Sequence, residues 1–143
     1  MSSAPFHKIL LPVDGSLSTA KLVRQCLEFA SKIDASVNAI HVVPTSHLEA
    51  EASMRPPGSG CPEDFARRVL QEVCVSARLA GVRCGTMVGR SNDAWRAILR
   101  AAGDTESDVI CILSHGRLGA GNRIGSQTAQ VLEHARLPVL VFR

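Results

Sequence analysis

Short apolar runs alternate along the chain with longer stretches in which apolar residues recur at helical spacing. The runs are bounded by turn-forming or polar residues and cover residues 8–13, 37–43, 82–88, 108–113 and 138–142. Continuous short runs of this kind are typical of strands that are buried on both faces. Apolar residues that repeat every three or four positions predict amphipathic helices at 16–33, 62–80, 93–102 and 126–135.

Regular alternation of strands and helices predicts an α/β fold. We expect a doubly wound, five-stranded parallel sheet with helices on both faces, which makes a three-layer α/β/α arrangement. No internal repeat divides the 143 residues, so 1–143 is predicted to be a single domain. Residues 44–61 are rich in Pro and Gly and are predicted to form a long loop. In the second helix the predicted core-facing residues are Phe65, Val69, Val73, Ser76 and Ala80.

Candidate site residues follow the strands. Open parallel sheets bind ligands outside the carboxyl ends of their strands. The segment 114–125 is rich in glycine and leads into a helix that begins near Ser126, where amide groups and the helix dipole favour a phosphate. The alternative is a flexible loop with a capping serine. Asp14, at the end of the first strand, is either a ligand for a ribose or base, or a helix cap. His41 alternates with apolar neighbours and is predicted to be structural.

Composition excludes several classes of function. Hydrophobic residues make up 45% and charged residues 20%, as in soluble globular proteins. No apolar run is long enough to span a membrane, and the start resembles no secretion signal. The net charge of +3 is spread along the chain and aromatic residues are only 3%, so nucleic-acid binding is not expected. Five cysteines without a CxxC pair, and dispersed histidines, predict reduced thiols, no metal site and a cytoplasmic location.

Catalytic motifs are missing from the sequence. There is no GxxxxGK[ST] loop, and no GxGxxG follows the first strand, which disfavours a P-loop enzyme and a dinucleotide-binding domain. Ser114 and His115 are adjacent, but no GxSxG elbow surrounds the serine. We therefore expect no catalytic residues and no efficient enzyme activity. The least favoured alternative is a small hydrolase that uses Asp14, Ser114 or His115.

Three motifs together resemble the universal stress protein family. They are the opening Lys8-Ile-Leu-Leu-Pro-Val-Asp14-Gly-Ser16, the segment Asp108-Val-Ile-Cys-Ile-Leu-Ser-His-Gly116, and an ending that runs from Gly125-Ser126 through Val131-Leu-Glu-His-Ala135 to Pro138-Val-Leu-Val141. The resemblance spans nearly the whole chain. It implies a fold of the adenine nucleotide α-hydrolase type and a stress-response protein that binds ATP or AMP as a regulatory ligand, with Mg²⁺ if ATP is bound.

Individual site residues follow from this resemblance. It implies that Pro12 and Asp14 lie beside the base and ribose and that the backbone of Val43 meets the adenine. It implies a phosphate site formed by Gly116, Gly125, Ser126, Gln127 and Thr128.

The chain departs from the family's glycine motif in two ways. Leu113 occupies the place of the first glycine, and eight residues rather than nine separate Gly116 from Gly125. A leucine there would be strained if the position required a positive φ. These departures keep open a second function, that of a dimeric protein-interaction module without nucleotide.

The resemblance also implies a homodimer. In this family dimers often pair through the last strand, which here contains Val139, Leu140, Val141 and Phe142. This strand would otherwise be an exposed apolar edge.

Overall fold

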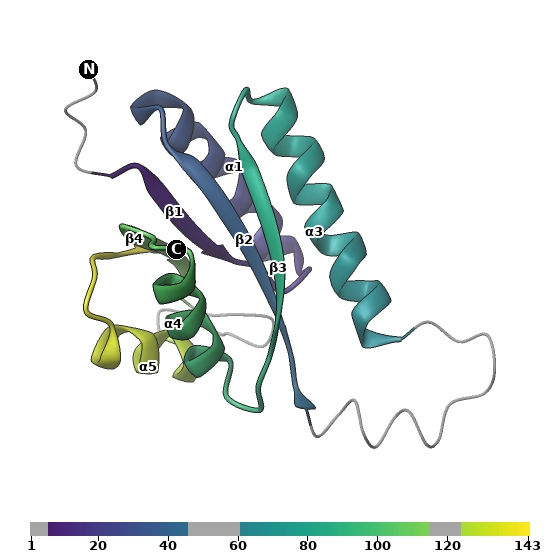
Figure 1. Ribbon diagram of the computed structural model, residues 1–143, viewed down its shortest axis with the longest axis vertical. Helices are drawn as coiled ribbons and strands as arrows, with labels where there is room; N and C mark the ends of the chain where they lie inside the picture. The colour runs from purple at the N-terminus through teal and green to yellow at the C-terminus, as the bar shows by residue number, and fades with distance from the viewer. Residues whose placement is uncertain (1–5, 46–60, 115–123) are drawn as a thin grey trace.

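Parallel strands form a single five-stranded sheet within the residues that this computed structural model describes, 6–45, 61–114 and 124–143. Their bounds are β1 Lys8–Pro12, β2 Ser36–Val43, β3 Cys84–Arg90, β4 Val109–Leu113 and β5 Val139–Phe142. The order across the sheet is β3-β2-β1-β4-β5, so the chain winds outward from β1 and then crosses back to β4 (Figure 1). The predicted doubly wound α/β fold is confirmed. The predicted loop at 44–61 lies almost entirely outside the described residues.

Helices cover both faces of the sheet. α1 (Leu17–Ile33) and α3 (Pro62–Leu79) lie on one face, and α4 (Ala94–Asp104) and α5 (Ser126–His134) lie on the other (Figure 1). Side chains along β1 alternate between the two cores: Ile9 and Leu11 pack towards α1 and α3, whereas Leu10 packs towards α4. All three are fully buried, which explains why the strand reads as an unbroken apolar run.

The buried face of α3 differs from the predicted one. Val69 and Val73 are buried as expected, but Phe65 is 40% exposed, and Ser76 and Ala80 are exposed. The helix is rotated so that its buried residues are Ala66, Val69, Leu70, Val73 and Ala77. This face presents small alanines as well as branched side chains to the sheet, which lets the helix lie close against it.

β3 also begins two residues later than the sequence predicts. Gly81 has a φ of +72°, and the Val82 amide donates to the Ala77 carbonyl over 2.9 Å, so these residues still close the end of α3. Pairing with β2 starts only where Val37 faces Cys84.

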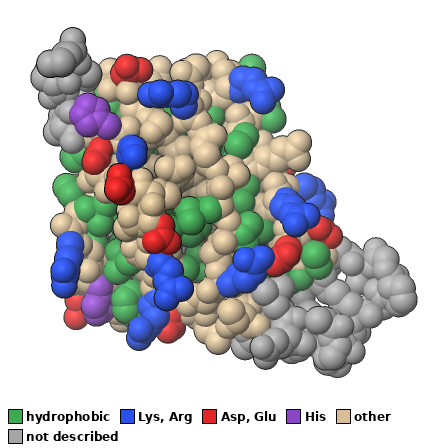
Figure 2. All heavy atoms as spheres, viewed as in Figure 1, with side chains coloured by type: hydrophobic (Ala, Val, Ile, Leu, Met, Phe, Trp, Pro, Cys, Tyr) green, Lys and Arg blue, Asp and Glu red, His purple; other side chains and the backbone are tan. Residues whose placement is uncertain are grey.

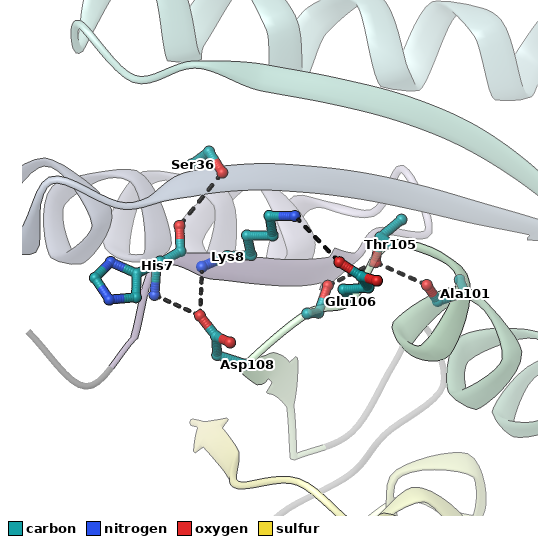
Figure 3. Close-up of polar contacts among 8 residues, drawn as sticks. His7, Lys8, Ser36, Ala101, Thr105, Glu106 and Asp108 are labelled. Carbon is teal, nitrogen blue, oxygen red and sulfur yellow. Dashed lines mark hydrogen bonds and ion pairs between the residues drawn. The ribbon is translucent and has the colours of Figure 1, made fainter.

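A polar clamp holds the amino ends of β1 and β4 together (Figure 3). The Asp108 carboxylate accepts hydrogen bonds from the backbone amides of His7 over 2.6 Å and Lys8 over 2.9 Å. These bonds, that from His7 foremost, lower the pKa of Asp108 below its usual value. Lys8 also forms an exposed ion pair of 3.9 Å with Glu106. The clamp fixes the register of the two central strands at the edge opposite the candidate site.

Candidate functional site at the carboxyl ends of β1 and β4

The order of the sheet reverses between β1 and β4. Ile9 pairs with Val109, and Leu10 pairs with Ile110. Continuing that register beyond the strands brings Asp14 level with Ser114. α1, which follows β1, and α5, which follows β4, lie on opposite faces of the sheet, and the carboxyl ends of two such strands are the usual ligand position in these folds. We call the place formed by residues 12–16, 113–114 and 124–128 the β1–β4 crevice.

Asp14 organises the turn that follows β1. Its Oδ1 accepts a hydrogen bond of 2.8 Å from the Ser16 amide and a second, short one from the Thr19 hydroxyl. The hydroxyl of Ser16 in turn accepts from the Thr19 amide over 3.2 Å and caps α1. The sequence left open whether Asp14 is the cap. The structure gives the capping role to Ser16, while the half-buried Asp14 carboxylate, two residues beyond the end of β1, holds the turn before α1.

Side chains from β2 and α3 pack against this turn. Gly15 has a φ of +83°, and a Cβ on it would lie 2.8 Å from Phe65 Cζ and 2.9 Å from Val69 Cγ2. The buried His41 ring contacts the Val13 carbonyl oxygen through Nδ1 over 2.9 Å and meets the Phe65 ring edge-on at 5.7 Å. The prediction that His41 is structural is confirmed. The backbone that carries Asp14 is therefore held from two sides.

The start of α5 is fastened to the end of β4. The buried Thr128 hydroxyl donates to the Leu113 carbonyl over 2.6 Å, and the Gly125 amide donates to the Ser114 carbonyl over 2.6 Å. The Ser114 amide donates to the Phe142 carbonyl over 2.7 Å, which ties β5 to the same place. Within the described residues no side chain caps the first turn of α5. The amide groups of a helix start and the positive end of its dipole favour an anion.

Leu113 fits this arrangement without strain. It ends β4 in strand conformation, pairs with Phe142, and packs half-buried against the core beneath α1 and α3. Among the described non-glycine residues, only Asp34 and Glu106 have a positive φ. The substitution of leucine for the family's glycine therefore does not carry the backbone penalty that the motif suggested. Gly116 and His115 lie outside the described residues.

Two other predicted ligand residues already hold their neighbours. The Gln127 side-chain oxygen accepts from the Trp95 amide over 3.0 Å and serves α4, which has no side-chain cap of its own at Asp93. The Val43 carbonyl accepts from the Ser91 amide over 3.1 Å. Sequence reasoning missed the link from Gln127 to Trp95, because a cap supplied from 32 residues away leaves no local pattern.

The described residues contain free thiols and no cluster of metal ligands. All five cysteines lie in described segments and are free thiols. A hydrogen bond with Cys111, together with burial, raises the pKa of Cys26, and burial beside Cys74 raises the pKa of Cys84 to about 12. Residues 6–45, 61–114 and 124–143 contain no cluster of three His, Cys, Asp or Glu side chains that could hold a metal ion. No helix in these ranges is long and apolar enough to cross a membrane.

Comparison with known families decides what this site belongs to. The model of the universal stress protein family matches residues 5–143. The chain belongs to the universal stress protein family. Universal stress protein MJ0531 of Methanocaldococcus jannaschii is 29% identical over 142 residues, which is 96% of this chain and 82% of that protein.

Solved structures, some of them of universal stress proteins, share the fold. The structure of hypothetical protein MJ0577 superposes with a TM-score of 0.80 at 20% identity over 96% of both chains. A universal stress protein in complex with cAMP matches 98% of both chains with a TM-score of 0.72 and 17% identity. The Archaeoglobus fulgidus protein in complex with dAMP has a TM-score of 0.70 and 19% identity over 98% of this chain and 100% of that one.

Proposed function

We propose that this universal stress protein binds an adenine nucleotide, ATP or AMP, in the β1–β4 crevice as a regulatory ligand. The observation that carries the proposal is the first turn of α5, which no side chain in the described part of the chain caps and which Thr128 and Gly125 anchor to the end of β4. Anchored amides and a fixed dipole form an anion site at little cost in conformational entropy. Neighbours of the same fold in complex with cAMP and dAMP support an adenine nucleotide.

Each residue has a role in this proposal. Pro12 and Asp14 receive the base and ribose, with Asp14 accepting hydrogen bonds from ribose hydroxyls. The side chains of Gln127 and Thr128 already hold Trp95 and Leu113, so their backbone amides, with that of Ser126, serve the phosphates. Gly116 completes the phosphate loop by resemblance alone, and Mg²⁺ would accompany ATP.

The nucleotide acts in this proposal as a ligand and not as a substrate. Asp14, the titratable side chain at the crevice, already accepts hydrogen bonds from Ser16 and Thr19, so it is held as an acceptor and not presented as a base to an attacking water. We therefore expect at most very slow phosphate release, and a cytoplasmic protein that requires neither nucleic acid nor a membrane. The rate of phosphate release from ATP in steady state tests the expected slow hydrolysis.

Asp14→Asn is expected to weaken ATP and AMP binding at least tenfold, about 1.4 kcal/mol. The asparagine oxygen can still accept from Ser16 and Thr19, so the turn is kept, whereas the second carboxylate oxygen becomes an amide donor. Isothermal titration calorimetry of the wild type and the variant gives both dissociation constants.

Asp34→Asn is the matched control. Asp34 is exposed at the other end of α1 with a φ of 57°, a conformation that asparagine tolerates, so binding should not change. A wild-type dissociation constant above about 1 mM, or equal losses in both variants, would reject the nucleotide proposal.

The alternative function is a protein-interaction module without nucleotide. The engagement of Val43 and Gln127 by Ser91 and Trp95 favours it, because groups expected to meet the ligand already have partners. It becomes the better account if the wild type binds neither ATP nor AMP in the titration above.

We propose a homodimer formed through β5. β5 is an edge strand of the described sheet, and Val141 is 36% exposed on it, while Phe142 is half-buried. Pairing with a second copy would satisfy the free backbone groups of this edge. We expect Val141→Lys to raise the dimer dissociation constant at least tenfold in sedimentation equilibrium, by placing like charges opposite each other. A monomeric wild type at micromolar concentration would contradict the dimer.

A further inference from the structure

A second concave site lies between the edge strand β3 and α4, away from the β1–β4 crevice. It has a volume of about 420 Å³, within the usual range for small-molecule sites. Its floor is apolar and includes Ile40, Met87 and Ala97, and its rim carries Arg90, Arg96 and Arg100. Figure 2 shows basic side chains gathered over α4 and over the carboxyl end of β3 on this face. We call this place the arginine groove.

Small residues create the groove. A Cβ on Gly89 would lie 3.1 Å from Ile40 Cδ1 and 3.2 Å from Ala97 Cβ, so α4 lies close against the strand only because residue 89 has no side chain. Beyond this contact Met87 is half-buried, and no large side chain of α4 fills the space above it, since Ala97 and Ala101 line that wall. The apolar floor is therefore open to a ligand.

The arginines differ in how far they are already engaged. Arg90 is paired with Glu63, and Arg96 uses Nε on Asp93 over 3.2 Å. Arg100 has no hydrogen-bond or ion-pair partner among the described residues. The terminal nitrogens of Arg96 and the whole guanidinium of Arg100 are thus donors without a described acceptor.

Geometry on α4 places these donors together. Arg96 and Arg100 are four residues apart on one helix, so they share a face and lie one turn apart. The Arg96 guanidinium is positioned by Trp95, whose ring centre lies 4.7 Å from it. Two guanidinium groups one turn apart can each donate to oxygens of a single dianionic phosphate.

Asp104 limits what else the ligand can carry. It lines the groove one turn beyond Arg100 and forms no ion pair with it in the described part of the chain. Its carboxylate repels a second anionic group and accepts hydrogen bonds from a hydroxyl. The groove thus favours one phosphate group at the Arg96 and Arg100 end over a polyphosphate.

We infer that the arginine groove binds a small organic phosphate monoester, with the phosphate on Arg96 and Arg100 and the organic part on Met87 and Ile40. This site is separate from the proposed nucleotide site, because residues of β2, β3 and α4 together with Ser91 line it and no residue of β1, β4 or α5 does. The inference therefore does not rest on nucleotide binding.

Phenyl phosphate is a suitable probe, because its ring fits the apolar floor and its dianion fits the arginines. We expect a titration followed by ¹H–¹⁵N spectra to shift the amides of Met87, Gly89, Ala97 and Arg100. Benzoate, a monoanion, should bind more weakly than phenyl phosphate. Phenol, which is neutral, should bind more weakly than benzoate. Arg100→Gln should weaken phenyl phosphate binding about tenfold while leaving ATP binding unchanged, since it removes charge-assisted hydrogen bonds.

Arg78→Gln, on the exposed side of α3, is the matched control and should bind the probe like the wild type. Shifts confined to Gly125–Thr128 would show that the phosphate prefers the β1–β4 crevice and would overturn the inference. So would equal weakening in both arginine variants, or no shift with phenyl phosphate at about 20 mM, a concentration that detects even millimolar affinity. If the wild type does not bind ATP but phenyl phosphate still shifts the amides of the arginine groove, the nucleotide proposal is rejected and this inference stands.

Discussion

Gly15→Ala is expected to lower the free energy of unfolding by about 2–4 kcal/mol. The alanine would keep a φ of +83°, which disfavours L-residues by about 1–2 kcal/mol. Its Cβ would also meet Phe65 Cζ at 2.8 Å and Val69 Cγ2 at 2.9 Å. Phe65 is 40% exposed and its ring can swing outward, but Val69 is buried in the core and has nowhere to move. Urea denaturation followed by circular dichroism measures the loss.

Gly81→Ala separates the two causes. Gly81 has a φ of +72°, but nothing lies within 4 Å of a Cβ built there, so only the backbone penalty of about 1–2 kcal/mol applies. Equal losses at the two glycines would show that contact with Phe65 and Val69 does not restrict the turn. The variant at residue 15 should also bind ATP more weakly, because this turn carries Asp14, whereas the variant at 81 should not.

Leu10→Ala is expected to cost about 2–5 kcal/mol. Leu10 is fully buried near the middle of β1, where it packs with Ile40 and Ile110 between the sheet and α4. Removing most of its side chain leaves a cavity between neighbours that are held by strand pairing on both sides, so the structure can relax only in part. The midpoint of urea denaturation gives the change if the slope stays constant.

The control makes the same substitution where no burial is lost. Leu17 is 92% exposed at the start of α1, so Leu17→Ala should change the free energy of unfolding by no more than about 0.5 kcal/mol. A loss of similar size at both positions would mean that the substitution acts through the unfolded chain and not through the core.

Much of the fold could be predicted because strand burial and helix periodicity are local patterns. The run at 8–13 is apolar on both faces, and Ile9, Leu10 and Leu11 are indeed fully buried in alternating directions. The prediction of which face of α3 is buried was wrong, because apolar residues lie on more than one face of that helix. The choice of Ala66, Leu70 and Ala77 over Ser76 and Ala80 is made by contact with β2 and β3.

The candidate site was only partly predictable, because some of its contacts depend on packing between helices and not on local sequence patterns. The positions of Asp14 and the start of α5 follow from where β1 and β4 end, and the structure places each of them beside the end of its strand. The engagement of Gln127 by Trp95 depends on how α4 and α5 pack, which no spacing encodes. The consequences of Leu113 depended on its φ, and the sequence pattern does not give that angle. The sequence did place Leu113 in the strand at 108–113, and the structure confirms that β4 extends through this residue.

The contacts of Trp95 give the protein a built-in optical probe. It is the single tryptophan of the chain, its ring stacks on His134 of α5 at 4.5 Å, and its amide is held by Gln127 from the first turn of that helix. Any displacement of α5 therefore alters the surroundings of the indole. Its ultraviolet emission reports on the crevice without a dye, in the unmodified polypeptide and at the low concentrations where tight binding is measured.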